Sequence, residues 1–190
     1  MWSVWRKVFL LVALTFLVGC GGSASNLGDG SDSRMDMRQA AERADGILDD
    51  TLGAITPEVR WTHDTTTVGS CSLTRRRTLM TIVSAQRRGN LLGVVERFWK
   101  SNGYKITSTN NSVDFPAIFA VTKDGFEAAL IVGGEGQVFF EADTPCVQES
   151  EVADPTAKPN APSYEGMENI PRPNIHSDFW SAATPASAAP

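Results

Sequence analysis

The stretch GNLLGVVERFWKSNGYKI, residues 89–106, carries the most regular hydrophobic pattern in the chain. Asn90 can cap a helix at its start, and Gly103 stands where a left-handed residue commonly ends one. Between them the apolar side chains return to one face, at Leu91, Val94, Val95 and Phe98, with Leu92 and Trp99 at its margin. The pattern therefore predicts an amphipathic helix from Leu91 to Ser101.

The residues before this helix predict another helix and two strands. Apolar residues recur at helical spacing at Met37, Ala40, Ala44, Ile47, Leu48 and Leu52. Asp32 and Asp36 stand at the start, where carboxylates suit the helix dipole, and Pro57 ends the pattern. The β-favouring stretch VRWTHDTTTV, residues 59–68, and the alternating residues 73–86 then predict a hairpin.

The residues after the helix predict four more strands. They are residues 104–109, 117–122, 126–132 and 137–142. The pair Asp124-Gly125 is a strong hairpin signal, and Gly133-Gly134 is a weaker one. The order α-β-β-α-β-β-β-β with short turns predicts an α+β fold, in which two helices pack on one face of an antiparallel β-sheet as a two-layer sandwich.

Residues 1–19 have the composition of a signal peptide. An apolar core over residues 8–18 follows Arg6 and Lys7, and a small residue precedes Cys20. The apolar run is shorter than the ~18 residues that a membrane-spanning helix needs. A transmembrane anchor with an incidental cysteine is therefore the less favoured alternative.

The tetrapeptide LVGC, residues 17–20, resembles the lipobox of bacterial lipoproteins. The resemblance implies that Cys20 receives a diacylglyceryl group and becomes the mature N-terminus. The lipid would then anchor the protein to the outer face of the cytoplasmic membrane. Residues 20–30, rich in Gly and Ser, are expected to form a flexible tether to a single domain over residues 31–147.

The motifs FWKSNGY, KDGF and DTPCV, taken together with the lipobox, are similar to features of small lipoproteins of high-GC Gram-positive bacteria. The resemblance covers most of the domain. It implies a fold and a location, but that group supplies no known activity to carry over.

Two cysteines remain after Cys20, namely Cys71 and Cys146. An even pair in an exported protein favours a disulfide bond. A redox pair or a metal site is the alternative, but the chain has neither a CxxC spacing nor clustered histidines. We therefore expect a Cys71–Cys146 bond, no metal site and no cofactor.

The charge pattern excludes one class of partner and suggests another. The full chain has a formal net charge of −5, and loss of two basic residues with the signal peptide makes it more acidic. Nucleic acid is excluded, because its recognition needs clustered positive charge. Arg75, Arg76 and Arg77 nevertheless stand in succession on a predicted strand, where the outer two share a face and the middle one takes the other.

These three arginines allow two interpretations. They can contact a small anionic ligand or the acidic surface of an envelope protein, because guanidinium groups match carboxylates and phosphates. They can also pair with Asp and Glu side chains on neighbouring strands across an exposed sheet face. We favour the second interpretation.

The search for catalytic motifs finds no nucleophile elbow, phosphate loop or HExxH sequence. The only histidines are His63 and His176. Asp64 adjoins His63, but neighbours on a strand point to opposite faces, which favours a structural histidine. Three carboxylates are expected to cluster near one end of the sheet, namely Glu135, Glu141 and Asp143.

Residues 148–190 are rich in Pro and Ala and show no sustained periodicity, so an extended or disordered tail is expected. Ile175, Phe179 and Trp180 concentrate apolar surface in this tail. They can dock on a partner or fold back onto the domain, and we favour the second.

Together these features predict a membrane-anchored extracytoplasmic lipoprotein that serves as a non-enzymatic interaction or ligand-binding module of the cell envelope. The alternative is a hydrolase-like envelope enzyme with an acidic site at the sheet edge. A catalytic site needs a pocket where titratable groups converge, whereas a binding module needs an open sheet face or a groove.

Overall fold

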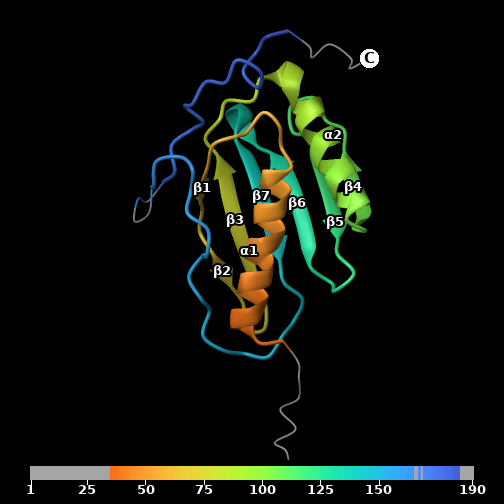
Figure 1. Cartoon of the computed structure of the whole chain (residues 1–190), viewed down its shortest axis with the longest axis vertical. Coiled ribbons are helices and arrows are strands. Elements are labelled where there is room, and N and C mark those ends of the chain that lie inside the picture. The colour runs from red at the N-terminus through yellow and green to blue at the C-terminus, as the bar shows by residue number, and fades with distance from the viewer. Residues whose placement is uncertain (1–34, 165–166, 168, 185–190) are drawn as a thin grey trace, which may run out of the picture. The chain divides into compact units, whose positions relative to one another are not determined.

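The α+β fold that the sequence predicts is confirmed by a computed structural model, which describes residues 35–164, 167 and 169–184 (Figure 1). The predicted signal peptide, Cys20 and tether lie outside these residues. The elements are α1 (Met37–Gly53), β1 (Trp61–His63), β2 (Thr67–Val68), β3 (Leu73–Leu79), α2 (Ala85–Ser101), β4 (Lys105–Asn110), β5 (Ala117–Val121), β6 (Glu127–Val132), the 3-10 helix η1 (Gly134–Gly136) and β7 (Val138–Asp143).

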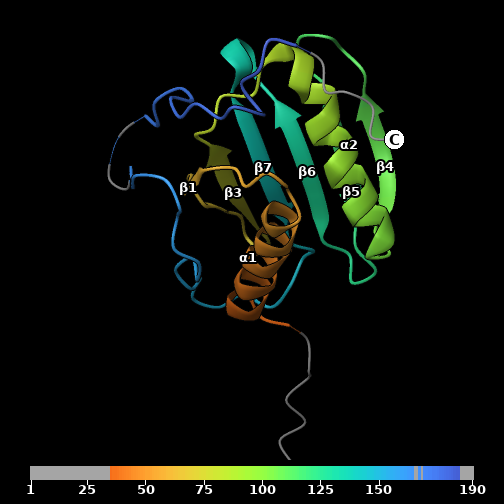
Figure 2. The same cartoon turned by 45° about the horizontal axis from the view of Figure 1, so that its top comes forward.

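The sheet is antiparallel throughout, in the order β1-β3-β7-β6-β5-β4, with β2 paired to β3. The last strand, β7, therefore lies between β3 and β6. Helix α1 contacts β3 and β7, and α2 contacts β4, β5 and β6. Figures 1 and 2 both show the two helices in front of the sheet.

Helix α1 begins where its sequence provides a capping box. Asp36 Oδ1 accepts the Gln39 N–H at 2.8 Å, and Gln39 Oε1 accepts the Asp36 N–H at 3.1 Å. This reciprocal pair satisfies two donors at the helix start, so the start is fixed by local sequence.

Helix α2 begins six residues before the predicted Leu91, so the expected cap at Asn90 is wrong. Its N-cap is Ser84, whose N–H donates to Trp180 O at 3.0 Å and whose hydroxyl donates to Ala182 O at 2.6 Å. Residues far along the chain thus fix this start. The predicted C-terminal end is confirmed, because Gly103 adopts a φ of 78° just after the helix.

The first predicted hairpin is also shorter and more broken than expected. Strand β3 ends at Leu79 rather than near residue 86. The N–H groups of Met80 and Thr81, which follow it, both donate to Arg60 O and so do not continue the strand pairing. The predicted strand over residues 59–68 is split into β1 and β2. The split lies at Asp64, whose side chain accepts the Thr65 N–H at 2.6 Å.

The core lies between the helices and the sheet. Its largest fully buried apolar side chains are Trp99, Trp180, Phe126, Phe140, Met37, Ile47, Leu48, Leu79, Met80, Leu91 and Ile118. A hydrogen bond of 3.0 Å from Trp99 Nε1 to Thr51 Oγ1 joins α2 to α1. On the other side of the sheet, half-buried Phe119, Ile131 and Phe139 form an apolar centre.

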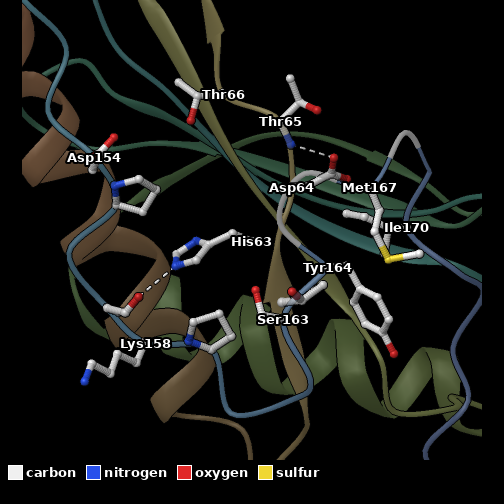
Figure 3. Close-up of a pocket in the computed structure, with 14 residues that line it drawn as sticks. His63, Asp64, Thr65, Thr66, Asp154, Lys158, Ser163, Tyr164, Met167 and Ile170 are labelled. Atoms are coloured by element: carbon white, nitrogen blue, oxygen red, sulfur yellow. Dashed lines mark hydrogen bonds between the residues drawn. The ribbon is translucent and has the colours of Figure 1, made fainter.

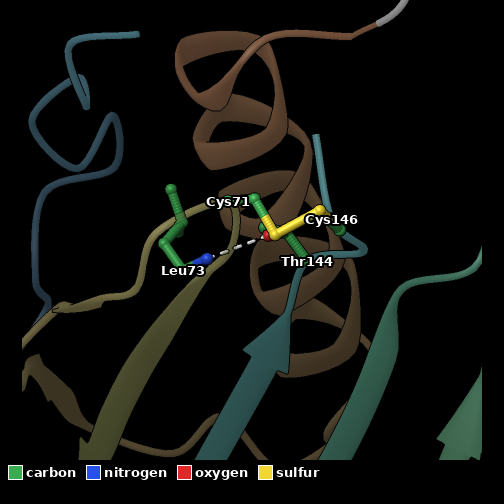
Figure 4. The surroundings of a disulfide bond; sticks show 4 residues. All are labelled: Cys71, Leu73, Thr144 and Cys146. Carbon is green, nitrogen blue, oxygen red and sulfur yellow. Dashed lines mark hydrogen bonds between the residues drawn. A yellow bond between two sulfur atoms is a disulfide. The ribbon is translucent and has the colours of Figure 1, made fainter. Parts of the chain in front are cut away.

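Cys71 and Cys146 lie at disulfide distance, with Cα atoms 4.8 Å apart, which is consistent with the predicted bond (Figure 4). They join the residues before β3 to the residues after β7. A hydrogen bond of 3.0 Å from Leu73 N to Thr144 Oγ1 runs alongside. The bridge therefore ties together two strands that are adjacent in the sheet but far apart in sequence.

The described residues after Val147 follow the domain closely. We call residues 148–164 and 169–184 the C-terminal segment. Asn160 Oδ1 accepts the Trp61 N–H at 2.8 Å, and Ile175 forms a parallel bridge with Thr81. Trp180 is fully buried and donates from Nε1 to Pro57 O at 2.6 Å.

The predicted domain end at Val147 is therefore too early. The C-terminal segment is extended, as expected, but it is packed against the domain by its amide and aromatic side chains. Of the two alternatives for its apolar residues, the structure shows folding back onto the domain.

Candidate functional site

A pocket of about 480 Å³ lies beside β1, between the sheet edge and the C-terminal segment (Figure 3). One wall comes from residues 62–66, which include the break between β1 and β2. The other comes from the C-terminal segment, whose side chains here include Asp154, Lys158 and Tyr164. The pocket therefore exists only because the C-terminal segment is folded onto the domain.

His63 is held by a backbone carbonyl of the C-terminal segment. Its Nε2 lies 2.7 Å from Ala157 O, and because a carbonyl only accepts, Nε2 is the donor. In the neutral ring Nδ1 is then the unprotonated nitrogen. The bond orients His63 and fastens the two walls of the pocket to each other.

The Asp64 carboxylate accepts hydrogen bonds from a backbone N–H and from a neighbouring hydroxyl rather than from His63. Its Oδ1 accepts the Thr65 N–H at 2.6 Å, and its Oδ2 accepts the Thr78 hydroxyl at 2.7 Å. Figure 3 shows the His63 ring and the Asp64 carboxylate pointing to opposite sides. The pair therefore lacks the geometry of a base with an orienting carboxylate.

The remaining polar groups of the pocket are mixed in charge. Lys158 contributes a cation, Asp154 a carboxylate, and Tyr164 a hydroxyl that accepts from Asn174 Nδ2 at 3.4 Å. Proline, Met167 and Ile170 side chains add apolar surface. The lining is therefore polar for the larger part, with apolar side chains between donors and acceptors that can orient a small molecule.

Behind the pocket lie two arginines of the sequence triplet. Arg75 and Arg77 point toward α1, with 3% and 0% of their surface exposed. Both face Asp45, at 3.4 Å from Arg75 Nε and 3.8 Å from Arg77 Nη2. Arg77 also pairs with Asp49 at 2.5 Å and stacks on the Trp61 ring, 4.1 Å from its centroid.

This buried network has a direct link to the pocket. Arg75 donates from Nη1 to Thr66 Oγ1 at 2.7 Å, and from Nη2 to Ala153 O. Burial raises the pKa of the Asp45 carboxyl, while Arg75 and Arg77 pull it down. Burial also lowers the pKa of the Arg75 guanidinium against the opposing pull of Asp45. The network supports the fold behind the pocket.

The predicted alternation of the three arginines is seen, but its consequence differs from the hypothesis of a partner contact. Arg75 and Arg77 are buried, so they present no surface to an anionic partner. Only the Arg76 side chain is well exposed, and it pairs with Glu141 on the neighbouring β7 at 2.6 Å. The pairing interpretation therefore fits Arg76, whereas the carboxylate partners of Arg75 and Arg77 lie on α1.

The expected acidic cluster does not form. Glu135 lies in η1, before β7, and pairs with Arg172. Glu141 pairs with Arg76, and Asp143 accepts the Thr74 hydroxyl at the far end of β7. The prediction of one cluster of these three carboxylates is wrong, because Glu135 precedes β7 whereas Glu141 and Asp143 lie in its second half, and each carboxylate has its own partner.

The pocket itself was not predicted, because half of it comes from a segment without hydrophobic periodicity. The signal that could have indicated it is the aromatic content of that segment, at Tyr164, Phe179 and Trp180. His176, the second histidine, is largely exposed and lies 3.8 Å from Asp178.

Comparison of the chain with protein-family models, with curated proteins and with solved structures gave no match. No helix within the described ranges is long and apolar enough to cross a membrane. Among the same residues, no group of three or more His, Cys, Asp or Glu side chains is arranged to hold a metal ion.

Proposed function

We propose that the protein is a membrane-anchored extracytoplasmic lipoprotein and acts as a non-enzymatic ligand-binding module of the cell envelope. The lipobox-like sequence at residues 17–20 supports the location. The pocket beside β1 supports binding, and its construction from the sheet edge and the C-terminal segment is the observation that carries the proposal.

The polar groups of this pocket favour binding over catalysis. His63 and Asp64 are each fixed by hydrogen bonds to groups other than one another. A fixed arrangement of donors and acceptors lowers the entropic cost of binding a ligand. Proton transfer instead needs an acid or base within reach of a reacting group.

The lining indicates the class of ligand. Threonine hydroxyls, Tyr164, Lys158 and two carboxylates offer both donors and acceptors, and the proline and methionine side chains offer apolar contact. This combination suits a small polar molecule with an apolar part. A charged macromolecule is a poorer fit, because the pocket carries both signs of charge.

Ligand screening by amide NMR tests the binding proposal. Small polar molecules that bind should shift the amide signals of His63, Thr66 and Tyr164. Lys158→Gln should weaken the binding of acidic hits, whereas Lys123→Gln, in the exposed turn after β5, is the matched control. Hits that shift only residues away from the pocket, or no hits from a broad panel, would contradict the proposal.

Membrane fractionation tests the location separately. Cys20→Ser should release the protein from membranes or leave an unprocessed precursor, because the remaining chain is acidic. Mass spectrometry of the mature N-terminus should find a lipid-modified cysteine. An unmodified residue at that position would remove the anchor and leave the pocket without its proposed location.

A further inference from the structure

The first turn of α2 lacks the features that usually stabilise a helix start. The Ser84 side chain does not cap the helix, because its hydroxyl donates to Ala182 O. The turn contains no acidic residue, and Arg87 and Arg88 stand in it instead. Positive side chains here oppose the helix dipole, whose N-terminal end is itself positive.

Arg87 is the more unusual of these two residues. It continues the buried stripe of Leu91, Val95 and Trp99, and only 7% of its surface is exposed. Its Nε and Nη1 atoms are buried and have no hydrogen-bond partner, and neither has Nε of Arg88. Nε of the buried Arg75 and Arg77 also lacks a hydrogen-bond partner, but both of those residues have carboxylate partners and no second unpartnered nitrogen. Arg87 has two unpartnered nitrogens, so a partner is missing at this place.

The Arg87 guanidinium lies at the N-terminal end of α2. Side chains on a helix lean toward its N-terminus. The Arg87 Cζ atom lies 4.4 Å from the centroid of the Phe179 ring. Trp180 follows Phe179 in the chain, and its backbone O accepts the N–H of the N-cap residue Ser84 at 3.0 Å. Phe179 and Arg87 therefore meet beside the first turn.

The charged groups around this turn are already engaged or point elsewhere. Arg88 donates from Nη1 to the carbonyl of Asp114 at 3.2 Å. Glu135 pairs with Arg172, and the fully exposed Asp178 carboxylate lies near His176. Within the described part of the chain, no ion pair reaches Arg87.

We infer that the N-terminus of α2 is a binding site for an oxyanion of the phosphate class, held by Arg87. Ligand oxygens accept from the Arg87 guanidinium, whose Nε and Nη1 atoms have no hydrogen-bond partner in the protein. The N–H groups of Ala85 and Gln86, which have no acceptor within the helix, supply two further donors. An anion also neutralises two cations that oppose the helix dipole.

This site shares no residue with the pocket beside β1, so it stands or falls independently of the proposed function. The same chemistry is offered by free phosphate and by the phosphate of a lipid headgroup. Both sources present oxygens to the same donors, and the experiment below distinguishes them.

The test is a phosphate titration of the full chain, purified in detergent, against chloride at matched ionic strength. Inorganic phosphate should shift the amide signals of Ala85 and Gln86 in a saturable way. Arg87→Gln should weaken this binding by about tenfold or more, because it removes a charge-assisted donor. Arg97→Gln, an exposed arginine later on the same helix, is the matched control and should bind as the wild type does.

Arg88→Gln keeps the test decisive if Arg87→Gln does not fold, since it should weaken binding without changing a buried residue. A second arm adds phosphatidylglycerol vesicles, with phosphatidylcholine vesicles as the control. If the protein binds phosphatidylglycerol vesicles in an arginine-dependent way but does not respond to free phosphate, the ligand is a lipid headgroup. No response to either probe, or equal phosphate binding by both arginine variants and the wild type, overturns the inference.

Discussion

Arg77 on β3 and Arg87 on α2 are both buried and both stack on an aromatic ring, at 4.1 Å from the Trp61 centroid and 4.4 Å from the Phe179 centroid. They differ in their charge partners. Arg77 forms ion pairs with Asp45 and Asp49, although its Nε has no hydrogen-bond partner. Arg87 lacks a hydrogen-bond partner at both Nε and Nη1, and none of the ion pairs among the described residues includes it.

The difference separates a structural role from a binding role. A buried cation with an internal carboxylate is part of the folded structure, and removal of one partner leaves the other charge uncompensated. A buried cation without such a partner keeps an uncompensated charge, which an anion can neutralise. The following variants test this distinction.

Removal of Arg77 should have the largest effect. Arg77→Met keeps the length of the side chain but leaves Asp45 with Arg75 alone. We expect a loss of about 3–5 kcal/mol in the free energy of unfolding, as is typical of a broken buried pair. Urea denaturation measures it. A loss below about 1 kcal/mol would mean that the pair with α1 is not structural.

The same variant has an expected pH dependence. Burial raises the pKa of Asp45, and removal of Arg77 takes away one of the groups that lower it. A carboxyl whose folded pKa lies above its unfolded value contributes stability below the unfolded pKa, and this is lost as pH rises through the folded pKa. The deficit of Arg77→Met should therefore be small near pH 4, about the unfolded pKa of Asp, and grow toward neutral pH.

The disulfide, which joins the residues before β3 to those after β7, should have an effect of similar size. Cys71 and Cys146 are 75 residues apart, and the chain-entropy model gives about 4 kcal/mol for a loop of this length. Reduction should lower the urea midpoint accordingly. Thiol labelling of the denatured, unreduced protein is the check, and two free thiols would show that the bond does not form.

A smaller effect is expected at the Arg87 site. Trp180→Phe keeps an aromatic ring beside Phe179 but removes the donor to Pro57 O. The unfolding free energy should fall by about 1–3 kcal/mol, the usual cost of a buried acceptor without a partner. Thermal unfolding measures this loss, and an unchanged midpoint would show that the C-terminal segment is not anchored through Trp180.

Local signals made much of the fold predictable. The capping box of Asp36 and Gln39 fixes the start of α1, and the positive φ of Gly103 marks the end of α2. The strand period also predicted that Arg75 and Arg77 share a face. Each of these features depends on residues only a few positions apart.

Features that depend on distant residues were not predictable in the same way. The start of α2 depends on Trp180 and Ala182, and the position of β7 depends on pairing with β3. The carboxylate partners of the buried arginines of β3 lie on α1, far from β3 in sequence. The pocket beside β1 needs the C-terminal segment in place, and no local pattern shows where that segment lies.

The most direct test compares the stability of the wild type, Arg77→Met and Arg87→Met, each in phosphate and in chloride at equal ionic strength. Without phosphate, Arg87→Met should lie within about 1 kcal/mol of the wild type, because it removes a cation that lacks a carboxylate. Phosphate should stabilise the wild type and Arg77→Met but not Arg87→Met. An Arg87→Met variant as unstable as Arg77→Met without phosphate, or a wild type that gains nothing from phosphate, would contradict the account.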